Sequence, residues 1–190
     1  MGRGESSSQH VLSEGAVLQL CILTVIAVAL RSAEVFIPTP VPWVRIGLAN
    51  TVVVFTLLRF GPKAALLVNL SRILLASVLM GTFLSPGFWL SLASGIASTG
   101  AMIVSLRMLN RWFSCIGLSM IGAYVHVVAQ FLLAYLVFVR HAAVLTLMPY
   151  FMLFSLAAGA LTGVIARKML SVASDYGLAA SAQTSREATA

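Results

Sequence analysis

Residues 145–166 read LTLMPYFMLFSLAAGALTGVIA and contain no charged side chain. A helix needs about 20 apolar residues to cross the roughly 30 Å hydrocarbon core of a bilayer, so this stretch is long enough to span one. Similar apolar runs, bounded by charge, glycine or proline, recur along the chain. They predict five further spans, at residues 15–36, 46–60, 64–80, 88–106 and 118–139. The second of these is short, so it would thin the bilayer or be completed by loop structure buried in protein.

The composition agrees with a membrane protein. Hydrophobic residues make up 60% of the 190 residues and charged residues only 9%, whereas soluble domains carry about 25% charged residues. Such a chain has too little polar surface to cover a water-soluble globule. We predict an all-α membrane protein, a bundle of six transmembrane helices. Its parts would be a polar N-terminal segment at 1–14, the membrane domain at 15–170 and a disordered cytoplasmic tail at 171–190.

The basic residues indicate the orientation. The formal net charge is +7, and Lys and Arg accumulate in cytoplasmic loops of membrane proteins. With a cytoplasmic N-terminus, the basic residues inside are Arg3, Arg59, Lys63, Arg107, Arg111, Arg167 and Lys168, and those outside are Arg45 and Arg140. Both termini are therefore predicted to be cytoplasmic, in a multi-pass protein of the inner membrane. Because this bias explains the positive charge, nucleic acid is not expected as a partner.

Arg72 lies near the middle of the predicted span 64–80. At 1.5 Å per residue it is about 13 Å beyond Lys63. A charged side chain at that depth costs at least about 2.5 to 3.5 kcal/mol on insertion scales, so it needs a partner, a water-filled cavity or a function. Asn69 shares its helix face, so the two could bind one anionic or amide-bearing group. The alternative is a structural arginine satisfied by backbone carbonyls and Glu34.

Other polar residues in the spans allow two interpretations each. His126 and Gln130 are four residues apart, so both face one neighbour, either lining a cavity or making an interhelical hydrogen bond. Arg31 and Glu34 are three residues apart and could neutralise each other. Asn50 could cap the backbone or contact a ligand.

Small residues form stripes on several predicted helices. Lipid provides no hydrophobic force that drives helices together, so close backbone approach at small residues holds them in contact. We therefore assign these stripes to helix packing. They are Ser155, Gly159 and Gly163, then Ser91, Ser94 and Ser98, and finally Ala29 with Ala33.

Catalytic and metal-binding patterns are absent from the sequence. It has no glycine-rich phosphate loop with lysine and no nucleophile elbow, and its five acidic residues are scattered. Cys21 and Cys115 have no Cys or His neighbour at metal-ligand spacing. We predict no catalytic residue, no metal and no cofactor, and hence a protein that is not an enzyme.

A run of short motifs resembles a known membrane family. Residues 38–42 read PTPVP and residues 45–50 read RIGLAN, with Glu34 before them. This order is similar to the start of the Gx transporter family, and the similarity extends over about residues 34–163. Further along, it rests on KAALL at 63–67, then Arg72, Gly81, Ser91 to Gly95, Gly122, His126 and Gln130.

The resemblance implies one of two functions. Members of this family are often labelled heptaprenyl diphosphate synthase component I, and they are also grouped with the S components of energy-coupling-factor vitamin transporters. A prenyl diphosphate synthase holds Mg²⁺ on clustered aspartates, but Asp175 is the only aspartate of this chain. The S-component resemblance implies six helices, cytoplasmic termini, a site toward the outer face and a lid loop after the first helix.

We therefore predict a substrate-binding membrane protein for uptake of a small, vitamin-like compound with an anionic or carbonyl group. By analogy with S components, Ala29 and Ala33 would dock onto a transmembrane coupling subunit with ATPases. The alternatives are a membrane subunit associated with heptaprenyl or polyprenyl diphosphate synthesis, and a structural membrane subunit. The candidate substrate-binding residues are Arg72, Asn69, His126, Gln130, Asn50 and Glu34, and those of the lid are Phe36, Pro40, Trp43 and Arg45.

Overall fold

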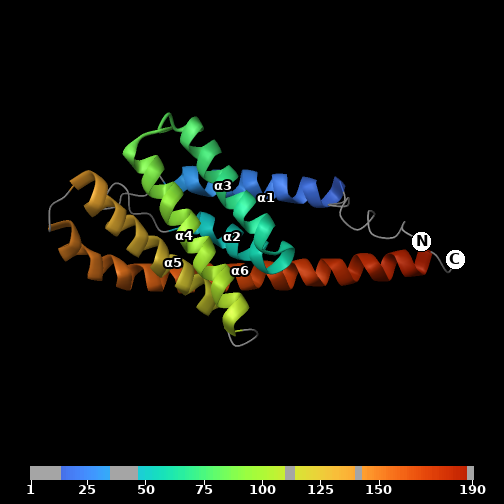
Figure 1. Cartoon of the computed structure of the whole chain (residues 1–190). Helices are drawn as coiled ribbons and strands as arrows, with labels where there is room; N and C mark the ends of the chain where they lie inside the picture. The colour runs from blue at the N-terminus through green and yellow to red at the C-terminus, as the bar shows by residue number, and fades with distance from the viewer. Residues whose placement is uncertain (1–13, 35–46, 110–113, 140–142, 188–190) are drawn as a thin grey trace, which may run out of the picture.

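The computed structural model describes residues 14–34, 47–109, 114–139 and 143–187. Within these ranges the chain forms six α-helices and one short π-helix, without any strand (Figure 1). The predicted all-helical class is confirmed. The helices are α1 (Glu14–Ala33), α2 (Leu48–Phe60), α3 (Pro62–Leu79), α4 (Pro86–Leu109), α5 (Cys115–Leu133), η2 (Ala134–Val139) and α6 (Ala143–Glu187).

Length and composition indicate a multi-pass membrane protein. In the described part of the chain, four helical stretches are long and apolar enough to cross a membrane, and they lie in α3, in α4, in α5 with η2, and in α6. The apolar parts of α1 and α2 are shorter, at Val17–Ala33 and Leu48–Phe60. Large apolar side chains such as Val25, Val78 and Leu153 are exposed on the outside of the bundle, where a bilayer would cover them.

The short helix α2 lies among the other helices. Eight of its 13 residues are buried, which is the pattern of a helix enclosed by protein on most sides. It packs against α1, α3, α5 and α6. Its first turn follows Gly47, whose φ of 82° is a left-handed conformation that glycine adopts readily.

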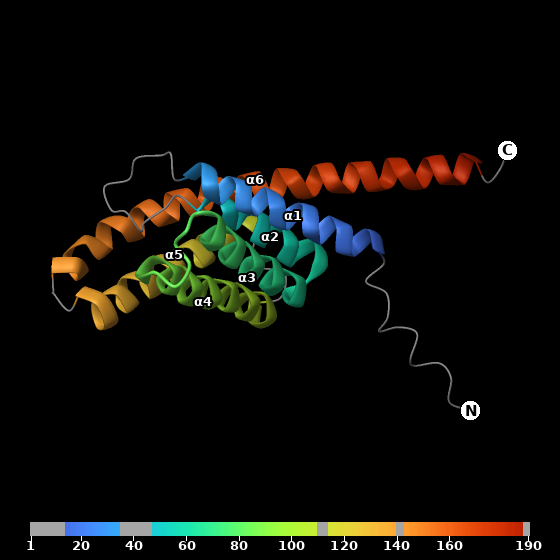
Figure 2. The same cartoon turned by 90° about the horizontal axis from the view of Figure 1, so that it is seen from above.

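Helices α5 and α6 approach each other closely through small residues (Figure 2). A Cβ atom at Gly159 would lie 2.9 Å from Cβ of Ala123, and one at Gly163 would lie 2.6 Å from Cα of Ile116. The hydroxyls of Ser119 and Thr162 also meet across this interface, at 2.8 Å. Glycine is therefore the residue that lets the two backbones pack at this distance.

The other two small-residue stripes have different surroundings. On α4, the hydroxyl of Ser98 donates a hydrogen bond to the carbonyl oxygen of Gly122 on α5, at 2.7 Å. Ser94 is fully buried. On α1, Ala29 and Ala33 are exposed, so they face away from the described helices.

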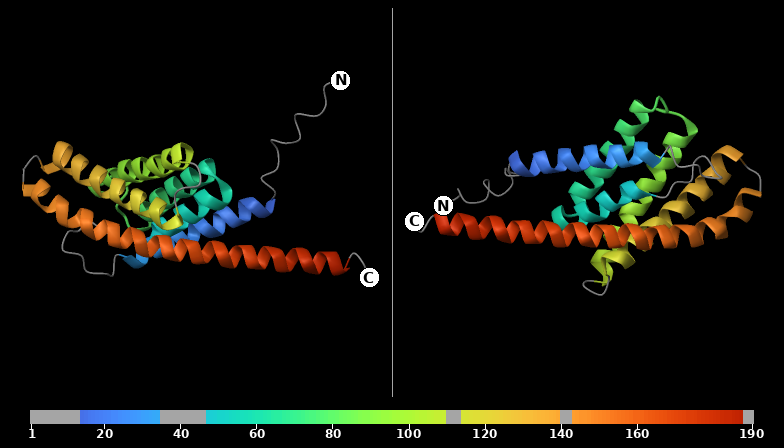
Figure 3. Two further views of the ribbon diagram at one scale, coloured as in Figure 1. Left: turned by 90° about the horizontal axis from the view of Figure 1, so that it is seen from below. Right: turned by 180° about the vertical axis from the view of Figure 1, so that it is seen from behind.

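Helix α6 extends further than the sequence predicts. It continues to Glu187, through the segment 171–187 that was predicted to be disordered, and Figure 3 shows it projecting beyond the other helices. The segment is rich in alanine, which has the highest helix propensity. At the start of this segment Ala173 contacts the apolar cluster formed by α1, α2 and α3, as do Met169 and Leu170 just before it.

Exposed basic side chains gather at one end of the bundle. Ala166 of α6 clusters with Leu57 of α2 and Ala65 of α3, and Leu106 of α4 packs against the same cluster. The neighbouring charged residues therefore share this end. They are Arg59, Lys63, Arg107, Arg167 and Lys168, all of them exposed.

Candidate functional site

All six helices, or the residues directly beside them, line one polar cavity, which we call the inner cavity. It has a volume of about 60 Å³, and every described residue on its wall is buried or half-buried. Each helix contributes at least one polar side chain. These include Arg31 of α1, Asn50 of α2, Arg72 of α3, Ser91 of α4, His126 of α5 and Ser155 of α6.

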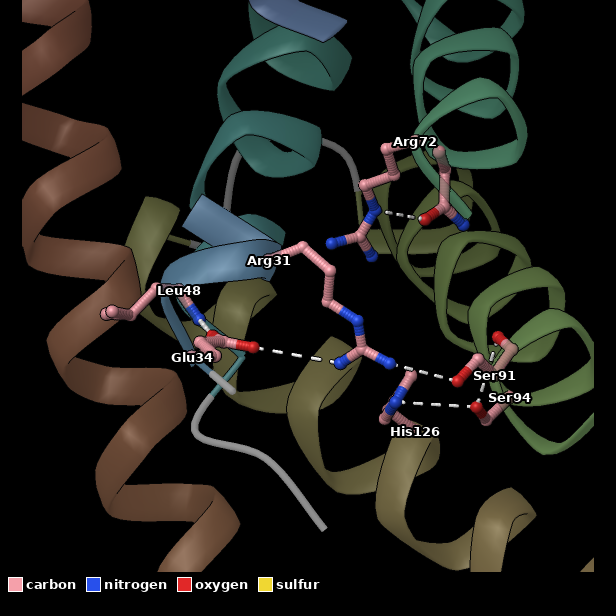
Figure 4. A network of polar contacts seen from close by, with 8 residues as sticks. Arg31, Glu34, Leu48, Arg72, Ser91, Ser94 and His126 are labelled. Carbon is pink, nitrogen blue, oxygen red and sulfur yellow. Dashed lines mark hydrogen bonds and ion pairs between the residues drawn. The ribbon is translucent and has the colours of Figure 1, made fainter. Parts of the chain in front are cut away.

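Arg72 is held in place by Asn69. Its Nε donates a hydrogen bond to Oδ1 of Asn69 at 2.8 Å, and the guanidinium group points away from α3 (Figure 4). Asn69 is 1% exposed. Its Nδ2 donates to the carbonyl oxygen of Gly95 at 2.9 Å and to Oγ1 of Thr99 at 2.8 Å. Asn69 therefore fixes Arg72 against α4 and leaves the two terminal nitrogens for the cavity.

Replacing Asn69 with leucine should destabilise the protein and displace Arg72. Nε of Arg72 loses its partner, and a buried unsatisfied donor costs about 1 to 3 kcal/mol. The Gly95 carbonyl and Thr99 Oγ1 each lose one hydrogen bond as well. We expect a lower unfolding free energy in a denaturant titration in detergent micelles. Asn50→Leu is the matched control, because the half-buried Asn50 contributes only a backbone hydrogen bond among the described residues. Equal losses in the two variants would contradict this role of Asn69.

Arg31 and Glu34 form the ion pair that their spacing predicts. Nη1 of Arg31 lies 3.7 Å from Oε2 of Glu34, and Nη2 donates to Oγ of Ser91 at 3.0 Å. The other carboxylate oxygen of Glu34 accepts a hydrogen bond from the backbone N–H of Leu48 (Figure 4). Gly47 provides no side-chain cap for α2, so Glu34 places a negative charge at that N-terminus. The carboxylate thus connects the end of α1 to the start of α2.

Glu34→Gln is expected to lower the unfolding free energy by about 1 to 3 kcal/mol, since the buried pair loses its negative charge. The same denaturant titration measures this loss. Asp175→Asn removes an exposed carboxylate and should change the unfolding free energy by less than about 0.5 kcal/mol. If Glu34→Gln also changed the unfolding free energy by less than about 0.5 kcal/mol, Glu34 would not hold α1 to α2.

His126 contacts α4 through Ser94. Nε2 of His126 lies 3.4 Å from Oγ of Ser94, and the Ser94 hydroxyl donates to the carbonyl oxygen of Leu90 at 2.6 Å. Since the serine hydrogen is used in that bond, Ser94 accepts from Nε2–H, which leaves Nδ1 of the imidazole as an acceptor. His126 therefore offers one acceptor nitrogen in addition to its contact with α4.

The structure brings most of the predicted binding residues together. Arg72, His126, Asn50 and Glu34 line the inner cavity, and Asn69 contacts it through Arg72. Gln130 is buried but does not belong to the cavity wall. The predicted lid residues lie outside the described residues; they are Phe36, Pro40, Trp43 and Arg45.

Four described polar residues of the wall were not predicted as binding residues; they are Arg31, Ser91, Ser155 and Thr162. Arg31 was assigned only to its pair with Glu34, Ser91 only to helix packing, and Thr162 was not considered. The one sequence signal for Thr162 is its four-residue spacing from Ala158, which lies on the same wall. Ser155 was predicted to pack helices, and it lies on the wall as well.

The chemistry of this wall suits an anion or a polarised carbonyl. It offers guanidinium groups, an imidazole, an amide and hydroxyls, together with a single carboxylate that already pairs with Arg31. In the described parts of the chain, no three His, Cys, Asp or Glu side chains come together as a metal site would need.

A family model described as heptaprenyl diphosphate synthase component I matches residues 23–169. The chain belongs to that family. The matched range includes every described residue of the cavity wall, from Arg31 to Thr162. No curated protein and no solved structure matches the chain. Membership of the heptaprenyl diphosphate synthase component I family confirms one label that the sequence predicted, while the relation to energy-coupling-factor S components stays a prediction.

Proposed function

We propose that this protein binds a small anionic compound in the inner cavity and serves its uptake into the cell. The observation that carries the proposal is Arg72. It is a buried cation on a membrane-type helix, and within the described residues no carboxylate lies at ion-pair distance from it. Such a charge is costly in a bilayer, and a cavity with an anionic ligand would offset that cost.

The ligand class follows from the charges and the size of the cavity. A guanidinium group binds a carboxylate or phosphate through two parallel hydrogen bonds. Because Glu34 neutralises Arg31, the described residues of the wall keep one net positive charge, which suits a monoanion. The volume of about 60 Å³ is far below the roughly 300 to 1,000 Å³ of drug-sized sites. The anionic group of a compact, vitamin-like compound fits these limits.

The arrangement of charges supports six spans with both termini in the cytoplasm. The exposed basic side chains lie at the end of the bundle that contains Arg59 and Lys63, which the positive-inside rule assigns to the cytoplasm. The inner cavity is lined by Gly47 and Asn50, at the opposite end of α2. A site near the outer face of the inner membrane is what an uptake protein requires.

Energy for uptake would come from partner subunits in this proposal. The sequence has no ATP-binding motif, and S components depend on a transmembrane coupling subunit with ATPases. Ala29 and Ala33 are exposed on α1, and small residues allow another helix to approach closely. This face of α1 is therefore our candidate for docking the coupling subunit.

The family description favours a second candidate function, a membrane subunit that assists heptaprenyl diphosphate synthesis. Arg72 would then bind a phosphate group. A chain of seven prenyl units cannot fit inside a cavity of about 60 Å³, so the hydrocarbon would have to lie elsewhere. The sequence also lacks clustered aspartates for Mg²⁺. In this alternative the protein is an accessory subunit and does not itself catalyse the synthesis.

Identification of the bound compound, followed by an uptake assay, tests the proposal. Small molecules are extracted from protein purified in mild detergent and identified by mass spectrometry. Uptake of the labelled compound is then compared between cells with and without the intact gene. We expect a small anion whose uptake depends on the gene. Retention of an isoprenoid, or uptake that is independent of the gene, would overturn the proposal.

A further inference from the structure

A second cavity adjoins the inner one, and we call it the outer cavity. It has a volume of about 200 Å³ and lies between α1, α3, α4 and the turn that joins α3 to α4. The two cavities share three wall residues, Arg31, Ile73 and Ser91. They are therefore neighbouring compartments separated by these side chains.

The outer cavity reaches the protein surface. Thr82 and Gly87 line the outer cavity and are exposed, whereas the described residues on the wall of the inner cavity are buried or half-buried. The rim is an ordered turn. The backbone N–H of Thr82 donates to the carbonyl oxygen of Ser77 at 2.8 Å, and the rings of Phe83 and Phe88 pack with centroids 5.2 Å apart.

The wall of the outer cavity suits an uncharged group. The hydroxyl of Ser77 donates to the Leu74 carbonyl at 2.8 Å, and Oγ of Ser85 accepts from the backbone N–H of Phe88 at 3.3 Å. Ser77 keeps its acceptor lone pairs and Ser85 keeps its hydroxyl hydrogen, so both can make neutral hydrogen bonds to a ligand. The rest of the wall is mainly apolar. Arg31 is the one charged residue among the described residues of this wall.

Arg31 stands at the division between the two cavities. Its side chain extends from α1 toward α4, where Nη2 bonds the neutral hydroxyl of Ser91 at 3.0 Å (Figure 4). A guanidinium group binds an anion more strongly than it binds a neutral hydroxyl. A passing anion can therefore take the place of Ser91. A cation gains no such contact, because it cannot accept a hydrogen bond from the guanidinium group.

We propose that the outer cavity is the entrance and the second compartment of the binding site. The ligand class is a small organic monoanion with a compact uncharged body. The anionic group passes Arg31 to reach Arg72, and the body occupies the outer cavity. Arg31 selects for negative charge at the division. This inference rests on the proposed function, because it takes Arg72 as the final partner of the anion.

Thiol labelling tests the route without knowledge of the natural ligand. Cys21 and Cys115 are first replaced by alanine, and Ser155→Cys then places a reporter thiol on the inner wall of the purified full-length protein. The probes are 2-sulfonatoethyl methanethiosulfonate, itself a small organic monoanion, and its cationic trimethylammonium analogue. Each labelling rate is divided by the rate of the same reagent with a free thiol. We expect this relative rate to be about tenfold higher for the anionic reagent, because a charged cleft raises the local concentration of its counter-ions.

Two variants test the entrance and the selection. Thr82→Trp adds bulk at the exposed rim and should slow labelling by both reagents severalfold. Thr146→Trp is the matched control, because Thr146 is exposed on α6 and lines neither cavity. Arg31→Gln should remove most of the preference for the anionic reagent, and Arg31→Lys should keep it. Thermal unfolding of each variant checks that the fold is retained.

Each result supports or overturns the proposal. An unreactive Ser155→Cys thiol, unchanged labelling in Thr82→Trp, or an unchanged charge preference in Arg31→Gln would overturn it. Failure here is separable from failure of the proposed function. A protein that retains a small anion while Thr82→Trp leaves labelling unchanged binds its ligand by another route. If labelling were selective for the anionic reagent but the protein retained and transported no compound, the entrance would be supported and the uptake function overturned.

Discussion

Replacing Arg72 with methionine is expected to abolish ligand binding without lowering the stability of the ligand-free protein. The hydrogen bonds of a ligand to a charged group contribute about 1.5 to 3 kcal/mol each, so affinity should fall by at least about tenfold. In the ligand-free state, however, Arg72 is a buried charge with one hydrogen bond to Asn69 among the described residues. Removing a poorly compensated buried charge relieves its desolvation cost, and this gain offsets the loss of the hydrogen-bond partner of Asn69 Oδ1.

Thermal unfolding in detergent, with and without the retained compound, measures both effects. The ligand-free melting temperature of Arg72→Met should equal or exceed that of the wild type, and the compound should no longer raise it. Arg59→Met is the control, since Arg59 is exposed at the other end of α2. A clear fall in the ligand-free melting temperature of Arg72→Met would show that Arg72 serves the fold and not a ligand.

Gly163→Ala is expected to be the most damaging single-methyl change on α6. The added Cβ would lie 2.6 Å from Cα of Ile116 and 3.1 Å from Cβ of Ser119. Because the nearest atom belongs to the backbone, no side-chain rotation relieves the overlap, and α5 and α6 must move apart. Overpacking of this kind costs about 1 to 3 kcal/mol, and the melting temperature in detergent should fall accordingly.

Gly100→Ala is the matched control for that variant. No atom lies within 4 Å of a Cβ at Gly100, and alanine is favoured over glycine in a helix by about 1 kcal/mol. The control should therefore be neutral or stabilising. If both variants had the same melting temperature, the close approach of α5 and α6 would not depend on glycine.

The positions of the helices could be predicted because lipid imposes a simple requirement on the sequence. A helix in a bilayer must be long and apolar, so each predicted span corresponds to a helix of the structure. Helix α2 was predicted to be short, and its burial among other helices gives the reason. The tail 171–187 was predicted to be disordered because it lacks an apolar period, whereas α6 continues through it to Glu187. Its alanine content favours a helix instead.

The candidate site was predictable only where burial of a residue is costly. Arg72 and Asn69 could be selected because a charge in the middle of a span needs an explanation, and their three-residue spacing places them together. Ser91 could not be distinguished from packing serines such as Ser98, because hydroxyls are tolerated at helix contacts. Gln130 is buried off the cavity wall. Its position depends on the rotation of α5 about its own axis, which the spacing of residues in the sequence does not determine.

Native mass spectrometry of the protein released from mild detergent tests most directly whether Arg72 binds an anion in the inner cavity. Wild-type protein, Arg72→Met and Arg59→Met are compared under one set of conditions. We predict a single small-molecule adduct on the wild type and on Arg59→Met, identified as an anion after dissociation, and no adduct on Arg72→Met. An adduct that persists at the same occupancy in Arg72→Met would contradict the assignment of Arg72 as the anion-binding residue.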